Sequence, residues 1–311
     1  MKRFKRILCA IDPGDESVLL IERAALLARR NNAELKVVGV VERFPSSPGT
    51  EAGFPSTGIR ELFLAEARDE IERLVDAADT QGLPIRTELL IGSPFIELIR
   101  EVLRDRHDLV IQGAEGKDGL KQRLFGSTTM HLMRKCPCPV WVMRSGHTRF
   151  ERVMACVDPD PENKDPRRQA LDHRILELSS SLAARESAEL HVVHAWSLFG
   201  EQMLRKRTAR EAVDQWKEGV RGAHQEELNR LVRKIESDGV PCATHLIKGP
   251  SREVLPSFAE SHAIDLIVMG TVCRTGVAGV LIGNTAEVVL QQAQCSVLAV
   301  KPDGFLSPVT L

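Results

Sequence analysis

The chain has 311 residues, and its 42 lysine and arginine residues against 43 aspartate and glutamate residues give a formal net charge of -1. This balance provides no global attraction to nucleic acid or to an anionic membrane, so we expect neither as a partner. Asp12 interrupts the first apolar run after about five residues, which is shorter than the core of a signal peptide. No window approaches the ~18 apolar residues of a membrane-spanning helix. We therefore expect a cytoplasmic protein without a membrane span.

Short apolar runs alternate with helical patterns along the first half of the chain. The runs are nearly continuously apolar, as is typical of strands buried on both faces, and lie at 7–12, 34–42, 85–91, 107–113 and 138–143. The helical patterns carry apolar residues at i, i+3 and i+4 spacing, and lie at 17–30, 59–79 and 94–105. Strands that alternate with helices predict an α/β fold, an open doubly wound parallel sheet with helices on both faces.

The second half of the chain repeats the first. The stretch "QGLPIRTELLIGSP" (81–94) aligns with "DGVPCATHLIKGPS" (238–251) at an offset of 239 − 82 = 157. The same offset carries "DLVIQG" onto "DLIVMG" and "CPVWVMR" onto "CSVLAVK". Near the start, "ILCAIDP" matches "VMACVDP" at 158 − 12 = 146, so the second copy has 157 − 146 = 11 additional residues. We predict two tandem domains at 1–145 and 151–311 with a linker at 146–150.

Ligands of doubly wound sheets bind at the carboxyl ends of the strands, where the strand order reverses. At such an end, Gly113 and Gly116 begin a long loop, and Gly126 precedes Ser127 and Thr128 at the start of a helix. Glycines let backbone N–H groups approach a bound group closely, and a helix N-terminus with a hydroxyl beside it favours an anion. The loop is neither a Walker A loop nor the G-x-G-x-x-G fingerprint. The alternative of an ordinary strand-to-helix turn remains open.

Several features together resemble the universal stress protein family over both copies. They are an aspartate that ends the first strand, a Gly-x-Pro turn at 92–94, the G-x2-G-x9-G-S/T segment and the closing "CPCPVWVM" strand. The resemblance implies a five-stranded parallel sheet of order 3-2-1-4-5 in each domain and, in the nucleotide-binding members, an ATP site. Under this resemblance Asp12 and Val40 flank the adenine and the ribose. The phosphates lie against Gly113, Gly116, Gly126, Ser127 and Thr128.

The second copy departs from this pattern. Its corresponding positions are Asp158, Ala195, Gly270, Cys273, Gly283, Asn284 and Thr285. Cys273 takes the place of the second glycine, and its Cβ and thiol obstruct close approach of the backbone. We therefore expect a degenerate site in the second domain that binds nucleotide weakly or not at all. For Cys273 itself, an unreactive loop thiol and a reactive thiol beside Arg274 are both open interpretations.

No metal site follows from the cysteines and histidines. The seven cysteines are an odd number and lie mostly in apolar runs, which favours reduced, buried thiols. His131, Cys136 and Cys138 have the spacing H-x4-C-x-C, which differs from the usual zinc knuckle. His191 and His194 stand at i and i+3 on an expected strand and should point to opposite faces.

Two segments outside these motifs are candidates for a binding surface. The Pro-, Ser- and Gly-rich stretch 44–58 is expected to be a mobile loop or lid beside the first site. The charged helical pattern at 205–236 places Val213, Trp216 and Val220 on one face, which is expected to pack on its own sheet. Covering a cavity or a partner chain is the alternative for that face.

The sequence favours a stress-response binding protein with an adenine nucleotide, ATP, in the first domain. It offers no convincing nucleophile, base or metal set, so we predict no catalytic residue. Two alternatives remain open: a slow ATPase, because a phosphate-binding loop stabilises developing charge without a dedicated base, and a scaffold that binds proteins, lipid or another apolar small ligand. The two domains are expected to form an intramolecular pseudo-dimer, and the sequence leaves a further homodimer undecided.

Overall fold

The computed structural model describes residues 4–12, 16–42, 57–114, 125–144, 149–162, 165–198, 200–237, 239–271 and 283–311. The chain divides into two compact units between residues 148 and 149, and Leu306–Leu311 group with the first unit. Gly116, Cys273 and most of the segment 44–58 lie outside the described residues. Within the described ranges, no helix is both long enough and apolar enough to cross a membrane.

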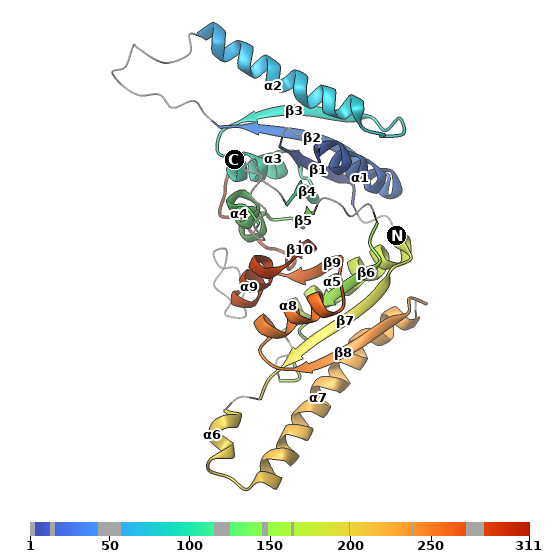
Figure 1. The fold of residues 1–311 in the computed structure, drawn as a ribbon, viewed down its shortest axis with the longest axis vertical. Coiled ribbons are helices and arrows are strands. Elements are labelled where there is room, and N and C mark those ends of the chain that lie inside the picture. Colours follow the sequence, from blue (N-terminus) through green and yellow to red (C-terminus); the bar gives the residue numbers. More distant parts are fainter. Residues whose placement is uncertain are drawn as a thin grey trace, which may run out of the picture. The chain divides into compact units, whose positions relative to one another are not determined.

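The first unit alternates strands and helices throughout (Figure 1). Its elements are β1 (Arg6–Ile11), α1 (Glu16–Asn31), β2 (Glu34–Val41), α2 (Thr57–Ala77), β3 (Ile85–Ile91), α3 (Pro94–Asp105), β4 (Leu109–Gly113), α4 (Ser127–Lys135) and β5 (Val140–Met143). The strands pair in parallel in the order β3-β2-β1-β4-β5. The expected order 3-2-1-4-5 is therefore confirmed for this unit.

The second unit repeats this architecture. Its elements are β6 (Arg152–Cys156), α5 (Pro166–Glu186), β7 (Glu189–Trp196), α6 (Glu201–Arg205), α7 (Arg210–Ser237), β8 (Cys242–Lys248), α8 (Ser251–Ser261), β9 (Leu266–Gly270), α9 (Asn284–Gln292) and β10 (Ser296–Val300). Its parallel strands lie in the order β10-β9-β6-β7-β8. When these strands are numbered 1 to 5 along the second copy and read from β8 to β10, the order is again 3-2-1-4-5.

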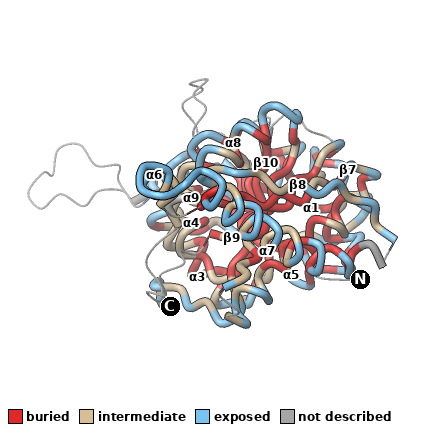
Figure 2. Tube along the Cα trace, turned by 90° about the horizontal axis from the view of Figure 1, so that it is seen from below, coloured by how far each residue is buried: buried red, intermediate tan, exposed pale blue. Residues whose placement is uncertain are grey.

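Burial along the strands follows their place in each sheet. In β1, β4 and β5 every residue except Arg6 and Gly113 is buried, because helices cover both faces of a central parallel strand. The edge strand β3 instead alternates between exposed and partly buried residues over most of its length. Figure 2 shows the same contrast in the second unit, between the buried strands β9 and β10 and the exposed helix α6. The cores therefore lie around the central strands.

Backbone conformation matches between the two copies at the places where helices and turns end. Residues with left-handed conformation recur at an offset of 157 in the pairs Gly82 and Gly239, Gly92 and Gly249, and Arg106 and Ala263. The residues that follow α1 and α5, Asn32 and Ser187, form another such pair at 187 − 32 = 155. The eleven additional residues of the second copy therefore divide into 155 − 146 = 9 after its first strand and 157 − 155 = 2 after its second.

The helical pattern expected at 205–236 is divided into two helices. Lys206 caps α6, and α7 begins at Arg210. In one continuous helix Lys206 and Arg210 would be a like-charged i, i+4 pair, which is unfavourable. The side chain of Val213 is buried, but Trp216 is 42% exposed, so the expectation that this whole face packs on the sheet is wrong. Figure 1 shows α6 and the first part of α7 extending past the strands of their unit.

The second half of α7 makes the packing contact with the unit. Leu228 is fully buried there, and it is followed at helical spacing by the buried residues Leu231, Val232 and Ile235. We expect Leu228→Ala to lower the free energy of unfolding by about 2–5 kcal/mol, because it leaves a cavity in the core. Trp216→Ala should change it by no more than about 0.5 kcal/mol, as at other exposed positions. Urea denaturation followed by circular dichroism measures both free energies. Equal losses would contradict the conclusion that the second half of α7, and not the part around Trp216, packs on the unit.

Candidate functional site

The predicted residues of the first unit gather at the carboxyl edge of its sheet. Ile11 of β1 lies beside Gly39 of β2, so Asp12 and Val40 follow at neighbouring strand ends. On the other side of β1, Ala10 pairs with Gln112, which places Gly113 at the same edge. This edge is the point where the strand order reverses, because β1 lies between β2 and β4. The structure therefore brings Asp12, Val40 and Gly113 together as the resemblance implies.

The N-terminus of α4 completes this edge. Gly126 is its N-cap residue, in an extended conformation, and as a glycine it has no side chain with which to cap the helix. A Cβ atom placed on Gly126 would meet nothing within 4 Å. The buried Thr129 hydroxyl accepts a hydrogen bond from the Gln112 side chain, which ties α4 to β4. Ser127 and Thr128 thus start a helix whose N-cap residue offers no side chain to its first N–H groups.

The two aspartates that end the first strand of each copy have different surroundings. Among the residues that the structure describes, the Asp12 carboxylate has no hydrogen-bond or ion-pair partner, and Ser17 donates to its backbone carbonyl. Asp158 instead accepts from the Arg168 guanidinium at 2.8 Å, and Arg168 also binds Asp160 at 3.0 Å. The second copy therefore neutralises its own strand-end aspartate.

A pocket of about 440 Å³ lies beside Asp158 in the second unit. It is lined by Asp158, Pro159, Asp160, Arg168, Gln169, Asp172, His173, Glu227, Arg230 and Leu231. Asp172 is buried and accepts a hydrogen bond of 2.9 Å from the backbone N–H of Asp158. Burial raises the pKa of Asp172 to about 7; the hydrogen bond opposes the rise and the Asp158 charge adds to it. At the offset of 155, Asp172 occupies the position of Ser17 in the first copy.

The other expected residues of the second site are engaged by their own unit. A Cβ atom on Gly270 would lie 2.8 Å from Leu171, so this backbone is already packed. The Thr285 hydroxyl lies 2.9 Å from that of Ser251, and the first copy has Pro94 at the position of Ser251. Ala195 is buried, and Gly283 donates its N–H to the carbonyl of Thr271 at 3.1 Å. Cys273 and the Asn284 side chain lie outside the described residues.

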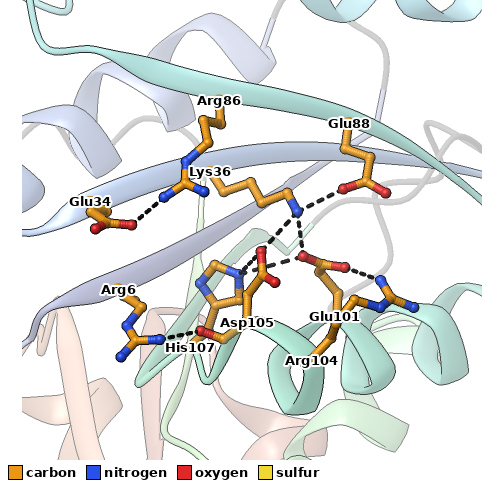
Figure 3. A network of polar contacts seen from close by, with 9 residues as sticks. All are labelled: Arg6, Glu34, Lys36, Arg86, Glu88, Glu101, Arg104, Asp105 and His107. Atoms are coloured by element: carbon orange, nitrogen blue, oxygen red, sulfur yellow. Dashed lines mark hydrogen bonds and ion pairs between the residues drawn. The ribbon is translucent and has the colours of Figure 1, made fainter. Parts of the chain in front are cut away.

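A buried ion network that sequence reasoning missed joins β2, β3 and α3 (Figure 3). The Lys36 ammonium lies 2.5 Å from Glu101, 2.6 Å from Glu88 and 3.1 Å from Asp105. The side chain of Lys36 is 12% exposed and that of Glu101 is 0% exposed. Burial alone would lower the pKa of Lys36, but the hydrogen bonds to the three carboxylates outweigh it and raise the pKa. The sequence signal was the single cation in the apolar run of β2.

His107 borders the same network. Its Nε2 atom lies 3.7 Å from Glu101 and 4.0 Å from Asp105, and neither ring nitrogen has a hydrogen-bond partner among the described residues. Burial lowers the pKa of His107, although the two carboxylates oppose this. Single ligand atoms of Glu101, Asp105 and His107 lie within 4.8 Å of one another, as in a metal site. The Lys36 ammonium already binds both carboxylates, so this cluster has its own cation.

The expected burial of Cys136 and Cys138 and the expected facing of His191 and His194 are confirmed. Cys136 and Cys138 are buried with their sulfur atoms 3.5 Å apart, and His131 stacks on Phe95 instead of facing them. His194 lies 2.9 Å from His224 of α7, whereas His191 contacts residues of β8 and α8. The two histidines of β7 therefore face opposite sides of the sheet, as predicted.

The raised pKa of Asp172 predicts a pH-dependent effect of Asp172→Asn. Between its ordinary pKa of 3.8 and the folded value of about 7, the folded chain binds the extra proton, so this group's stabilisation is lost as the pH rises. The asparagine side chain keeps the hydrogen-bond acceptor but not the charge. The variant should match the parent near pH 4 and be more stable by a few kcal/mol, to order of magnitude, near pH 8. Chemical denaturation across this range measures the difference; Asp303→Asn, at an exposed ion pair, should show none.

The Lys36 network predicts strong coupling between its members. Lys36→Met removes the buried cation of Glu101, which keeps only its pair with the half-exposed Arg104, and should lower the free energy of unfolding by about 3–5 kcal/mol. The double variant Lys36→Met/Glu101→Leu should recover most of this loss. Arg86→Met, which breaks the exposed pair with Glu34 next to the network, should cost no more than about 1 kcal/mol. A double variant no more stable than the single one would contradict the coupling.

Comparison with known proteins agrees with the repeat. Residues 3–144 and 149–301 each match the Universal stress protein family. Universal stress protein E of Salmonella typhi is 29% identical over 318 residues, covering 100% of this chain and 98% of that protein. Universal stress protein E of Escherichia coli (strain K12) is 28% identical over 314 residues, with the same coverage.

Solved structures share the fold over nearly the whole chain. A functionally unknown protein from Pseudomonas aeruginosa PAO1 superposes with a TM-score of 0.72 at 24% identity, covering 98% of this chain and 95% of that one. A putative universal stress protein from Pseudomonas aeruginosa UCBPP-PA14 gives a TM-score of 0.69 at 24% identity, with the same coverage. The chain belongs to the universal stress protein family, as a tandem member similar to Universal stress protein E.

Proposed function

We propose that the first unit binds an adenine nucleotide, with ATP as the first candidate, at the carboxyl edge of its sheet. The observation that carries this proposal is the difference between the matching aspartates. No described side chain pairs with the Asp12 carboxylate, whereas Arg168 pairs with Asp158 at 2.8 Å. A carboxylate without an internal partner can accept hydrogen bonds from the hydroxyl groups of a ribose.

The phosphate end of the proposed ligand would lie at the start of α4. The backbone N–H groups there carry the positive end of the helix dipole, and the Ser127 and Thr128 hydroxyls stand beside them. The Arg144 guanidinium lies 5.7 Å from the ring centre of Phe125, two positions before Ser127, and adds positive charge near this end. These groups would stabilise a phosphate anion by charge and by hydrogen bonds.

The second unit is proposed not to bind nucleotide in the same way. Arg168 satisfies Asp158, Ser251 engages the hydroxyl of Thr285, and Leu171 packs against Gly270. A nucleotide would have to displace each of these contacts before it formed its own. Release of the Arg168 guanidinium would also leave Asp158 beside the buried Asp172 without a compensating charge.

The proposed role of the first unit is binding and not turnover. The groups assigned to the phosphates are backbone N–H groups and hydroxyls, which hold charge but do not activate a water molecule as a base would. The match to the Universal stress protein family supports the proposal that this binding serves a stress response. Slow hydrolysis is a separate outcome that phosphate release during the binding experiment would reveal.

Asp12→Asn and Asp158→Asn form a matched pair of variants for this proposal. ATP should raise the melting temperature of the parent and of Asp158→Asn in the same way. Asp12→Asn should weaken ATP binding about tenfold or more, as expected when a hydrogen bond to a charged group is lost. Titration calorimetry and thermal shift measure the effects, and denaturation of the purified protein tests for co-purified nucleotide.

The opposite outcomes would each have a definite meaning. Equal weakening by both variants would show that the strand-end aspartates do not differ as proposed. The absence of any ATP-dependent change in the parent, together with no released nucleotide, would overturn the nucleotide proposal. Parallel titrations with ADP, AMP and cyclic AMP would identify which part of the ligand is recognised.

A further inference from the structure

The positions of the Lys36 network in the first unit correspond to a histidine cluster in the second. His191 stands at 191 − 36 = 155, the offset already established for the second strand. The positions of Glu88, Glu101 and Asp105 carry His245, Phe258 and His262, all at the offset of 157. The strand register agrees, because Lys36 lies opposite Arg86 and His191 lies opposite Ala243, again 243 − 86 = 157.

The three imidazoles of this cluster lie in contact with one another. His191 Nδ1 is 3.1 Å from His245 Nε2. The ring centre of His262 is 5.8 Å from those of both His191 and His245. Phe258 stacks on His262 at 3.8 Å and packs against His245 at 4.7 Å between ring centres.

In the first unit, the positions that match the histidine cluster surround a cation. There they converge on a cation, the Lys36 ammonium, with three carboxylates within 3.1 Å of it. The second unit has neither that ammonium nor those carboxylates, but it has three imidazoles in their place. Imidazole nitrogen is a preferred ligand of zinc, copper and nickel ions. The first unit therefore carries its cation on a side chain, whereas the second unit has a set of ligands for a metal ion from solution.

We propose that His191, His245 and His262 bind one first-row transition-metal ion, with Zn²⁺ as the probe. Two nitrogen ligands at about 2.0–2.1 Å from a tetrahedral zinc ion are about 3.3 Å apart. The separation of 3.1 Å between His191 Nδ1 and His245 Nε2 is close to this value. His262 supplies the third ligand by turning its ring toward this pair.

Neighbouring groups leave suitable nitrogen atoms for the ion. His262 Nδ1 lies 3.1 Å from the Phe258 carbonyl, so an Nδ1–H that donates there leaves the lone pair of Nε2 for a metal. His191 Nε2 has no hydrogen-bond partner among the described residues and lies 3.7 Å from the Glu189 carboxylate, which favours a proton on Nε2 and a free Nδ1. Burial is the main cause that lowers the pKa of His191 and of His245.

Access to the site comes from the side of His262. This side chain is exposed, whereas His191 and His245 are partly buried. An ion can therefore enter from solvent and reach the buried pair without opening of the core. The site shares no residue with the nucleotide site proposed for the first unit, so either can fail without the other.

The test uses the untagged full chain, freed of metal by EDTA and returned to neutral pH. Calorimetry with Zn²⁺ should give one tight site in the parent, and Co²⁺ should give visible absorption typical of nitrogen ligands. His245→Gln and His262→Gln should each lose at least the ~10- to 100-fold in affinity that loss of even an outer-shell partner costs. His131→Gln, which removes an imidazole of the first unit, is the control and should bind like the parent.

A variant that rebuilds the first-unit network guards against loss of folding as the explanation. His191→Lys/His245→Glu/His262→Asp restores the side chains found at Lys36, Glu88 and Asp105, and it should melt cooperatively without binding Zn²⁺ tightly. The proposal is overturned if the parent binds no Zn²⁺, or if His245→Gln and His262→Gln bind it as the parent does.

Discussion

Burial of the central strands on both faces is the constraint on which the rest of this structure depends. β1 and β4 of the first unit, and β6 and β9 of the second, are covered by helices, so nearly all of their side chains are apolar. A polar group in such a layer must either stand at a strand end or have partners within the core. Asp12 and Asp158 follow the first rule, and Lys36 with its three carboxylates follows the second.

The duplication provides an internal comparison, because one backbone carries two electrostatic arrangements. At the strand end, the pair Asp12 and Ser17 corresponds to Asp158 and Asp172, and only the second copy adds Arg168. The nine additional residues after β6 lengthen the connection into α5, the helix that carries Arg168 and Asp172. Arg168 therefore lies in the segment that contains the insertion, whereas Asp172 replaces Ser17 by substitution.

Each unit also fastens the helix after its third strand to its second strand, but by different interactions. In the first unit, the ammonium of Lys36 on β2 binds Glu101 and Asp105 of α3. In the second unit, ring contacts join His191 of β7 to Phe258 of α8 and to His262, the C-cap residue of that helix. A buried ion pair is costly to break but adds little over an apolar contact of similar shape, so the two solutions can stabilise the fold similarly. The two clusters differ in one respect: the cluster of the first unit contains its own cation, the Lys36 ammonium, and the histidine cluster of the second unit does not.

The sequence by itself determined the fold and the edge of the sheet at which Asp12, Val40 and Gly113 meet. Periodicity reports burial, and parallel strands end at a common edge, so these conclusions need only local pattern and register. It did not reveal that Arg168 binds Asp158, that Trp216 stays exposed, or that Lys36 meets residues 65 and 69 positions away. Only the tertiary structure decided these contacts, because they depend on which side chains from distant elements meet. The free energy of a buried charge is set by those partners and not by its neighbours in sequence.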